Sequence, residues 1–136
     1  MPAPRLDVPG APACLRHFGV KFAAGAPPGA GISSGTSRAY VRHEDPGPLT
    51  ESHVVALLDC MPPPVLQMMH TLASASTLTW TLEFIRHDFR FPVDAGWRID
   101  TEVCGAGAGY SQQRSLVLDP RGVPCAFSRQ LVAVFG

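Results

Sequence analysis

The sequence predicts an α+β domain in which one helix packs on an antiparallel β-sheet. Three observations lead to this prediction. An apolar run at residues 54–61 stops at three consecutive prolines, as expected of a helix that cannot continue. From residue 77 onward, apolar and polar residues alternate with the two-residue period of β-strands. Glycine-rich and Asp-Pro-Arg-Gly segments separate these strands, which therefore follow one another as antiparallel neighbours.

Composition favours one soluble globular domain. The chain has 136 residues, of which 46% are hydrophobic, enough for a real core. Eleven basic and eleven acidic residues give a formal net charge of zero, which removes the electrostatic argument for nucleic acid or an anionic membrane as partner. No apolar stretch reaches the ~18 residues of a membrane span, and the N-terminus lacks the apolar region of a signal peptide. We therefore expect one domain over residues 1–136 in the cytoplasm, with 1–13 as a flexible arm.

The four cysteines form no CxxC pair, and three of them lie in apolar or strand-like contexts. This pattern favours buried free thiols in a reducing compartment over a disulfide framework. The cysteines are Cys14, Cys60, Cys104 and Cys125.

The first half of the chain is expected to contain two short strands before the helix. Residues 16–23 are the first, and a loop rich in Gly, Pro and Ser follows. Residues 36–43 alternate in the manner of an exposed or edge strand. Thr50 is placed to cap the helix and Glu51 suits its first turn. The residues after the prolines, 65–76, fit no single pattern.

The second half reads as a series of strands. In the strand that begins at Thr77, Leu78, Trp80, Leu82 and Phe84 form one apolar face. Further strands are predicted at 97–104, 110–118 and 123–135, with a bulge or bend at 105–109 and a turn at 119–122.

Three residues are singled out as candidates for a functional site. Asp59 lies inside the apolar run near the C-terminal end of the helix, where the helix dipole disfavours a carboxylate and burial would be costly. Gln130 places an amide in a strand that is apolar on both sides downstream, so its hydrogen-bonding groups need partners. Thr77 opens a strand and on its own is an ordinary β-former. From the residues alone, each also fits a purely structural role.

Other motifs do not carry a site. Gly31-Ile32-Ser33-Ser34-Gly35 matches a nucleophile-elbow string but lies in a loop before a strand, without the required strand–turn–helix context. The glycines at 105, 107 and 109 lack the dinucleotide-binding spacing. The five histidines show no metal-ligand spacing.

In order along the chain, several weak motifs resemble the C-terminal half of the TesB-like acyl-CoA thioesterases. They cover about residues 36–136, and that family has the hotdog fold, an antiparallel sheet wrapped around one helix. The matching segments are Leu57-Leu58-Asp59, residues 76–84, Trp97, Gly109-Tyr110, residues 118–122 and residues 126–130.

The resemblance implies a site and a reaction. It assigns to Asp59, Thr77 and Gln130 the holding of the water that attacks a thioester carbonyl, with Asp59 as general base or water-orienting carboxylate. It implies acyl-CoA as substrate, a place in fatty acid metabolism, and no metal, cofactor or covalent intermediate. A backbone N–H near the helix would polarise the carbonyl.

The sequence also departs from this family. Members often carry an acidic residue and a histidine two and three positions after the Thr, where this chain has Thr79 and Trp80. The family usually joins two hotdog halves in one chain, so we expect a homodimer or a separate second hotdog domain as partner. Two further hypotheses stay open: a non-catalytic acyl-CoA-binding half that serves as a partner or scaffold, and another hotdog chemistry such as enoyl-CoA hydration.

Overall fold

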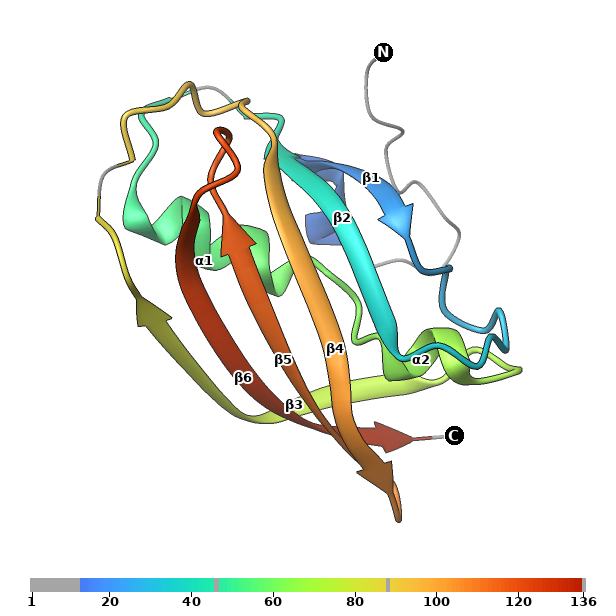
Figure 1. Ribbon diagram of the computed structural model, residues 1–136. Helices are drawn as coiled ribbons and strands as arrows, with labels where there is room; N and C mark the ends of the chain where they lie inside the picture. The colour runs from blue at the N-terminus through green and yellow to red at the C-terminus, as the bar shows by residue number, and fades with distance from the viewer. Residues whose placement is uncertain (1–12, 46, 88, 136) are drawn as a thin grey trace.

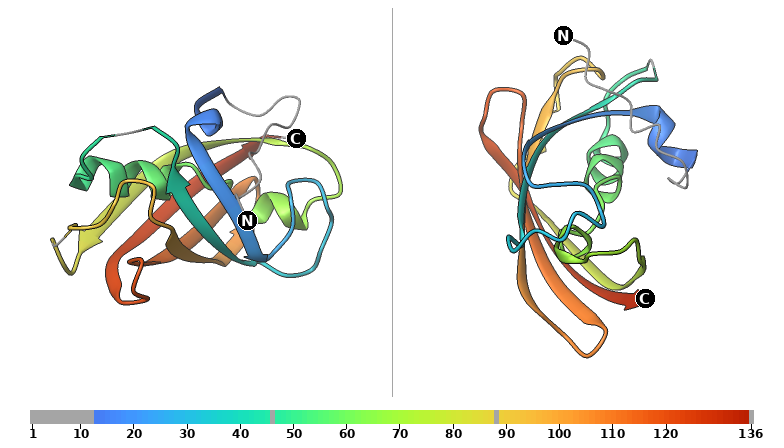
Figure 2. Two further views of the ribbon diagram at one scale, coloured as in Figure 1. Left: turned by 90° about the horizontal axis from the view of Figure 1, so that it is seen from above. Right: turned by 90° about the vertical axis from the view of Figure 1, so that its right-hand side faces the viewer.

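The computed structural model describes residues 13–45, 47–87 and 89–135. Within this part of the chain, six antiparallel strands form one curved sheet in the order β1-β2-β4-β5-β6-β3. Helices α1 and α2 lie on the same side of the sheet (Figure 1; Figure 2, right). The elements are the 3-10 helix Ala13–His17, β1 Phe18–Ala24, β2 Thr36–His43, α1 Glu51–Asp59, α2 Val65–Met68, β3 Ser74–Phe84, β4 Trp97–Gly107, β5 Tyr110–Leu118 and β6 Pro124–Phe135.

The main helix begins and ends where the sequence predicts. Thr50 has extended backbone at the N-cap, and its N–H donates to Nδ1 of His53 at 3.0 Å. The helix ends at Asp59, shortly before the prolines. Nε2 of the buried His43 donates to the backbone carbonyl of His53 at 2.9 Å, which ties β2 to α1. Burial lowers the pKa of His43, so its neutral form is favoured.

The hydrophobic core lies between α1 and the sheet. Helix residues Val54, Leu57 and Leu58 are spaced i, i+3, i+4 and are all buried. They meet an apolar zone on the inner face of the sheet, contributed by Ala39, Val41, Trp97, Ile99, Val117 and Ala126. This packing confirms the predicted α+β architecture with one helix on an antiparallel sheet.

Two expectations for the first half of the chain are wrong. Residues 16 and 17 belong to the 3-10 helix rather than to a strand. Strand β2 is not at the edge, because β1 pairs with it on one side and β4 on the other. Its alternation reflects a sheet with one face buried. The expected arm lies outside the described residues, except for Ala13, which begins the 3-10 helix.

The structure assigns residues 65–76, which fit no single pattern in the sequence, and it corrects the predicted apolar face of β3. Residues 65–68 are α2, and β3 starts at Ser74. A shift in register between Thr77 and Thr79 interrupts the pairing of β3 with β6. Trp80 remains half-buried, but Leu78 is 52% exposed and is not part of the predicted apolar face. The bulge adds a residue on one strand, which reverses the side on which the preceding residues lie.

The connections in the second half agree with the predicted turns. Ala108 and Gly109 have φ values of 52° and 84°, and they join β4 to β5 in a tight hairpin. The backbone N–H groups of Arg121 and Val123 donate to the carboxylate of Asp119, fixing the turn before β6. Strand β6 lies between β5 and β3, so it is an interior strand as predicted. No helix among the described residues has the length and apolarity to span a membrane.

Candidate active site

Two of the three predicted site residues are in direct contact. Nε2 of Gln130 on β6 donates a hydrogen bond to Oγ1 of Thr77 on β3. A third residue, which the sequence analysis missed, extends this hydrogen-bonded series. Nε2 of Gln113 on β5 donates to Oε1 of Gln130 at 2.9 Å. Three neighbouring strands thus contribute one side chain each to a continuous hydrogen-bonded series.

The series lies at the edge of a polar zone on the inner face of the sheet. Beyond the apolar zone under α1, four hydroxyl side chains occupy facing positions on four successive strands, and Thr101 Oγ1 and Ser115 Oγ are 2.8 Å apart. All four are buried: Ser37, Thr101, Ser115 and Ser128. The next residue along β5 on this face is Gln113. Polar side chains placed here must find partners within the protein or from a ligand.

Asp59 lies apart from this series. Its side chain is exposed, whereas its neighbours Leu58 and Cys60 are buried. In the described part of the chain, its carboxylate has no hydrogen-bond or ion-pair partner, so it contacts neither Thr77 nor Gln130. The expectation that this carboxylate is buried is wrong. Positions 54, 57 and 58 form the helix stripe that faces the sheet, and position 59 falls outside it.

The buried cysteines are poor candidates for a nucleophile. Burial raises the pKa of Cys60 to about 12 and that of Cys125 to about 11. Both therefore carry a protonated thiol at neutral pH. All four cysteines are free, and Cys14 and Cys104 are exposed. Among the described residues, His, Cys, Asp and Glu side chains form no group of three that could hold a metal ion.

The loop that matches the nucleophile-elbow string is held by a structural glutamine. Nε2 of Gln67 donates to the carbonyls of Ser34 and Thr36, and its Oε1 accepts from the N–H of Ala26. Gln67 is 3% exposed, and both ends of its amide have partners. The loop leads into β2 rather than a helix, which agrees with the prediction that it is not a nucleophile elbow.

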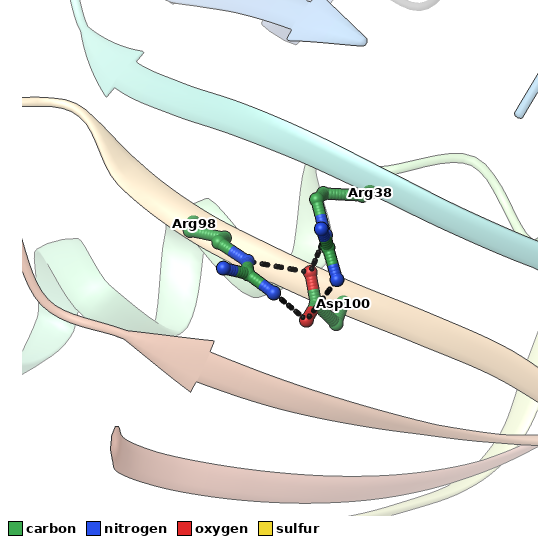
Figure 3. Close-up of polar contacts among 3 residues, drawn as sticks. All are labelled: Arg38, Arg98 and Asp100. Carbon is green, nitrogen blue, oxygen red and sulfur yellow. Dashed lines mark hydrogen bonds and ion pairs between the residues drawn. The ribbon is translucent and has the colours of Figure 1, made fainter. Parts of the chain in front are cut away.

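A second polar cluster lies on the outer face of the sheet. Asp100 accepts hydrogen bonds from both Arg98 and Arg38, at 2.7–3.4 Å (Figure 3). A hollow of about 550 Å³ nearby is lined by Arg38, Asp100, Glu102, Arg114 and Phe127 among others. Arg114 pairs with Glu102, and Arg38 shares Asp100 with Arg98, so each arginine that lines the hollow has a carboxylate partner there. This pairing favours a stabilising surface network over an anion site.

The Asp100 network is expected to stabilise the fold only above acidic pH. The hydrogen bond from Arg98 lowers the pKa of Asp100; partial burial opposes this, and Arg38 adds to the lowering. A carboxyl whose pKa is lower in the folded state contributes stability above its unfolded pKa of about 4, and the contribution is lost as the pH falls. Asp100→Asn should cost up to about 1 kcal/mol of unfolding free energy at pH 7 and less at pH 3, because the carboxylate is protonated progressively as the pH falls through its lowered pKa. Urea unfolding at both pH values measures this, with Asp94→Asn, an exposed aspartate, as control. Equal costs at the two pH values would contradict the assignment.

Solved structures define the class of fold. A conserved protein of unknown function with a hotdog fold from Alicyclobacillus acidocaldarius has a TM-score of 0.85 and 23% identity, over 98% of this chain and 51% of that one. An acyl-CoA thioesterase II from Mycobacterium marinum has a TM-score of 0.62 and 21% identity, over 100% and 56%. A thioesterase from Haemophilus influenzae has a TM-score of 0.67 and 13% identity, over 90% and 82%. The chain therefore has the hotdog fold.

A family model identifies the chain more narrowly. The model described as the acyl-CoA thioesterase C-terminal domain matches residues 1–134, so the chain belongs to that family. This confirms the resemblance seen in the sequence. The chain spans about half the length of the first two of these structures. No curated protein matches the sequence significantly.

Proposed function

We propose that this chain is an acyl-CoA thioesterase that hydrolyses the thioester with a water molecule oriented by Asp59, Thr77 and Gln130. Membership of the thioesterase family supports the reaction class. The single observation that carries the site is the hydrogen bond between Gln130 and Thr77. These residues are 53 positions apart in the sequence, and both are residues that the family resemblance assigns to the site.

In this mechanism each residue has a distinct part. Asp59 is exposed and available to take a proton from water, or to orient it, as the water attacks the thioester carbonyl. Thr77 and Gln130 fix the position of that water. The carbonyl carbon gains an oxygen from water, the carbon–sulfur bond breaks, and the products are a carboxylate and the thiol of CoA. The steps use no cofactor and no covalent intermediate.

The proposal includes a second hotdog domain, either another copy of the chain in the cytoplasm or a separate partner. Strand β3 supports this, because it forms one edge of the sheet and most of its side chains are exposed. Its eleven residues contain one charge, Glu83, and no proline, so the strand itself lacks the charges and prolines that usually protect an edge against pairing. Asp59 lies apart from Thr77 and Gln130 in the single domain, so in this proposal the three residues meet across the interface between the two hotdog domains.

Pairing through the β3 edge is expected to be disrupted by Leu78→Lys. Leu78 is 52% exposed at the bulge, and a charge there should leave the chain monomeric. Ile85→Lys is the matched control, because Ile85 is 63% exposed and follows the end of β3. Light scattering measures the mass of each variant. A Leu78→Lys protein that keeps the mass of the unmodified chain would exclude this edge as the interface.

The alternative function is a non-catalytic half that binds acyl-CoA as a partner or scaffold subunit. One observation favours it: Asp59 makes no contact with Thr77 or Gln130 within one chain. This alternative predicts tight binding of acyl-CoA without turnover.

A thiol-release assay separates the two functions. The purified chain is tested against acyl-CoA of increasing chain length, and light scattering gives the mass of the same sample. The thioesterase proposal predicts steady release of CoA by a paired species. Binding of acyl-CoA without thiol release at any chain length would overturn it in favour of the non-catalytic half.

A further inference from the structure

We propose that Gln113 is a positioning residue that sets the orientation of the Gln130 amide and, through it, of the Thr77 hydroxyl. This inference rests on the proposed function, because it concerns the same site. It adds a residue that neither the family resemblance nor the sequence pattern assigns.

The geometry makes Gln113 the support of Gln130. The two residues are direct partners in the β5–β6 register, and their side chains are joined at 2.9 Å. Gln113 is 5% exposed, so water does not compete freely for its amide. A hydrogen bond inside a protein fixes a side chain more firmly than one that exchanges with solvent.

The Gln113 amide and a neighbouring hydroxyl each have a buried atom without a partner. Among the residues that the structure describes, the Oε1 of Gln113 has no hydrogen-bond partner, nor has the Oγ of Ser111, the previous residue on this face of β5. If both amides were reversed, Gln130 would donate to Gln113, and the NH₂ group of Gln113 would occupy the buried position now held by its Oε1. That arrangement would leave both N–H protons of Gln113 unpaired, whereas the present one leaves one of these protons and the Oε1 unpaired. The hydrogen bonds from Gln113 to Gln130 and from Gln130 to Thr77 define the present orientation.

This orientation has a consequence for catalysis. Gln113 donates to Oε1 of Gln130, so the NH₂ group of Gln130 faces Thr77 and donates to its Oγ1. The hydroxyl of Thr77 already accepts one hydrogen bond, and its own proton is left to donate to a water or a substrate oxygen. In the reversed orientation, Thr77 would use that proton on Gln130 instead.

Gln113→Glu tests the inference through pH. A carboxylate cannot donate, so it should attract the NH₂ of Gln130 and reverse the amide. We expect kcat to fall about 10- to 100-fold at pH 8 with KM little changed. A protonated carboxyl donates to Oε1 of Gln130, so the deficit relative to the unmodified chain should shrink as the pH falls through the pKa of this buried acid, above about 4.3. Gln113→Leu should show a similar deficit without recovery at low pH.

Gln112 supplies matched controls, because it is the adjacent glutamine and is exposed. Gln112→Glu and Gln112→Leu should keep kcat and its pH profile, and circular dichroism confirms that every variant is folded. A folded Gln113→Leu with unchanged kcat would overturn the inference, as would a Gln113→Glu deficit that is equal at all pH values.

A readout without turnover separates this inference from the proposed function. Hydrogen exchange of the Gln130 side-chain amide, followed by NMR, should be protected in the unmodified chain and faster in Gln113→Leu. If the chain releases no thiol yet shows this difference, the thioesterase proposal fails and the positioning role of Gln113 stands. Equal exchange in both proteins would overturn the role of Gln113.

Discussion

Asp59→Asn is expected to lower kcat/KM for acyl-CoA hydrolysis by at least ~100-fold, the scale for loss of a general base. Asparagine has nearly the same shape but cannot accept a proton from water. Stability should not fall, because the Asp59 side chain is exposed at the C-terminal end of α1. Removing a negative charge from that end of a helix is neutral to slightly stabilising. Thiol release and urea unfolding of the same preparation measure both effects.

Glu51→Gln is the control for this prediction. Glu51 is another exposed acid on the same helix, at its other end, and it is 3.5 Å from His87. The same neutralisation there should leave hydrolysis unchanged. Full activity in Asp59→Asn would remove Asp59 from the mechanism, and a loss in both variants would indicate a general electrostatic effect.

Trp97→Ala is expected to cost about 3–5 kcal/mol of unfolding free energy, the range for deleting a large buried aromatic side chain. Trp97 is fully buried and contacts the ring of Phe91, with ring centroids 5.6 Å apart. It lies at the start of β4, in the core that α1 covers. Urea unfolding followed by circular dichroism measures the loss, which is large relative to the usual stability of a domain.

Trp97→Phe should cost less than Trp97→Ala, because phenylalanine leaves a smaller cavity than alanine. In the described part of the chain the buried Nε1 of Trp97 has no hydrogen-bond partner, so phenylalanine removes an unsatisfied donor along with some volume. The two effects oppose each other. Equal losses in Trp97→Ala and Trp97→Phe would mean that the indole N–H has a partner in solution.

The sequence predicted the elements better than the positions of side chains within them. The proline stop, the N-cap at Thr50 and the two-residue alternation were sufficient to locate α1 and most of the strands. The exposure of Asp59 could also have been predicted, because a 3.6-residue period through Val54, Leu57 and Leu58 places position 59 outside the buried stripe. The prediction of a buried carboxylate relied instead on the apolar residues next to Asp59 in the sequence.

The partners of Gln130 could not be predicted from the sequence, because they depend on the register in which neighbouring strands pair. The contact between Gln113 and Gln130 depends on how β5 pairs with β6, and that pairing shifts between Val117 and Leu118. The contact with Thr77 depends on the bulge in β3. A shift of one residue turns every side chain of a strand to the other face. Alternation alone therefore predicted a buried amide in need of partners at Gln130, which the structure leaves half-buried, but it did not predict which partners Gln130 has.

Single-turnover hydrolysis in water labelled with oxygen-18 tests the central claim most directly. With enzyme in excess over acyl-CoA, attack by a bound water places a labelled oxygen in the carboxylate product of the first turnover. Attack by the carboxylate of Asp59 would instead form an anhydride, and opening of that anhydride by water at the Asp59 carbonyl would leave an unlabelled oxygen in the product. We predict labelled carboxylate from the unmodified chain and little product from Asp59→Asn on the same timescale. Unlabelled carboxylate, or no product from the unmodified chain, would contradict the mechanism.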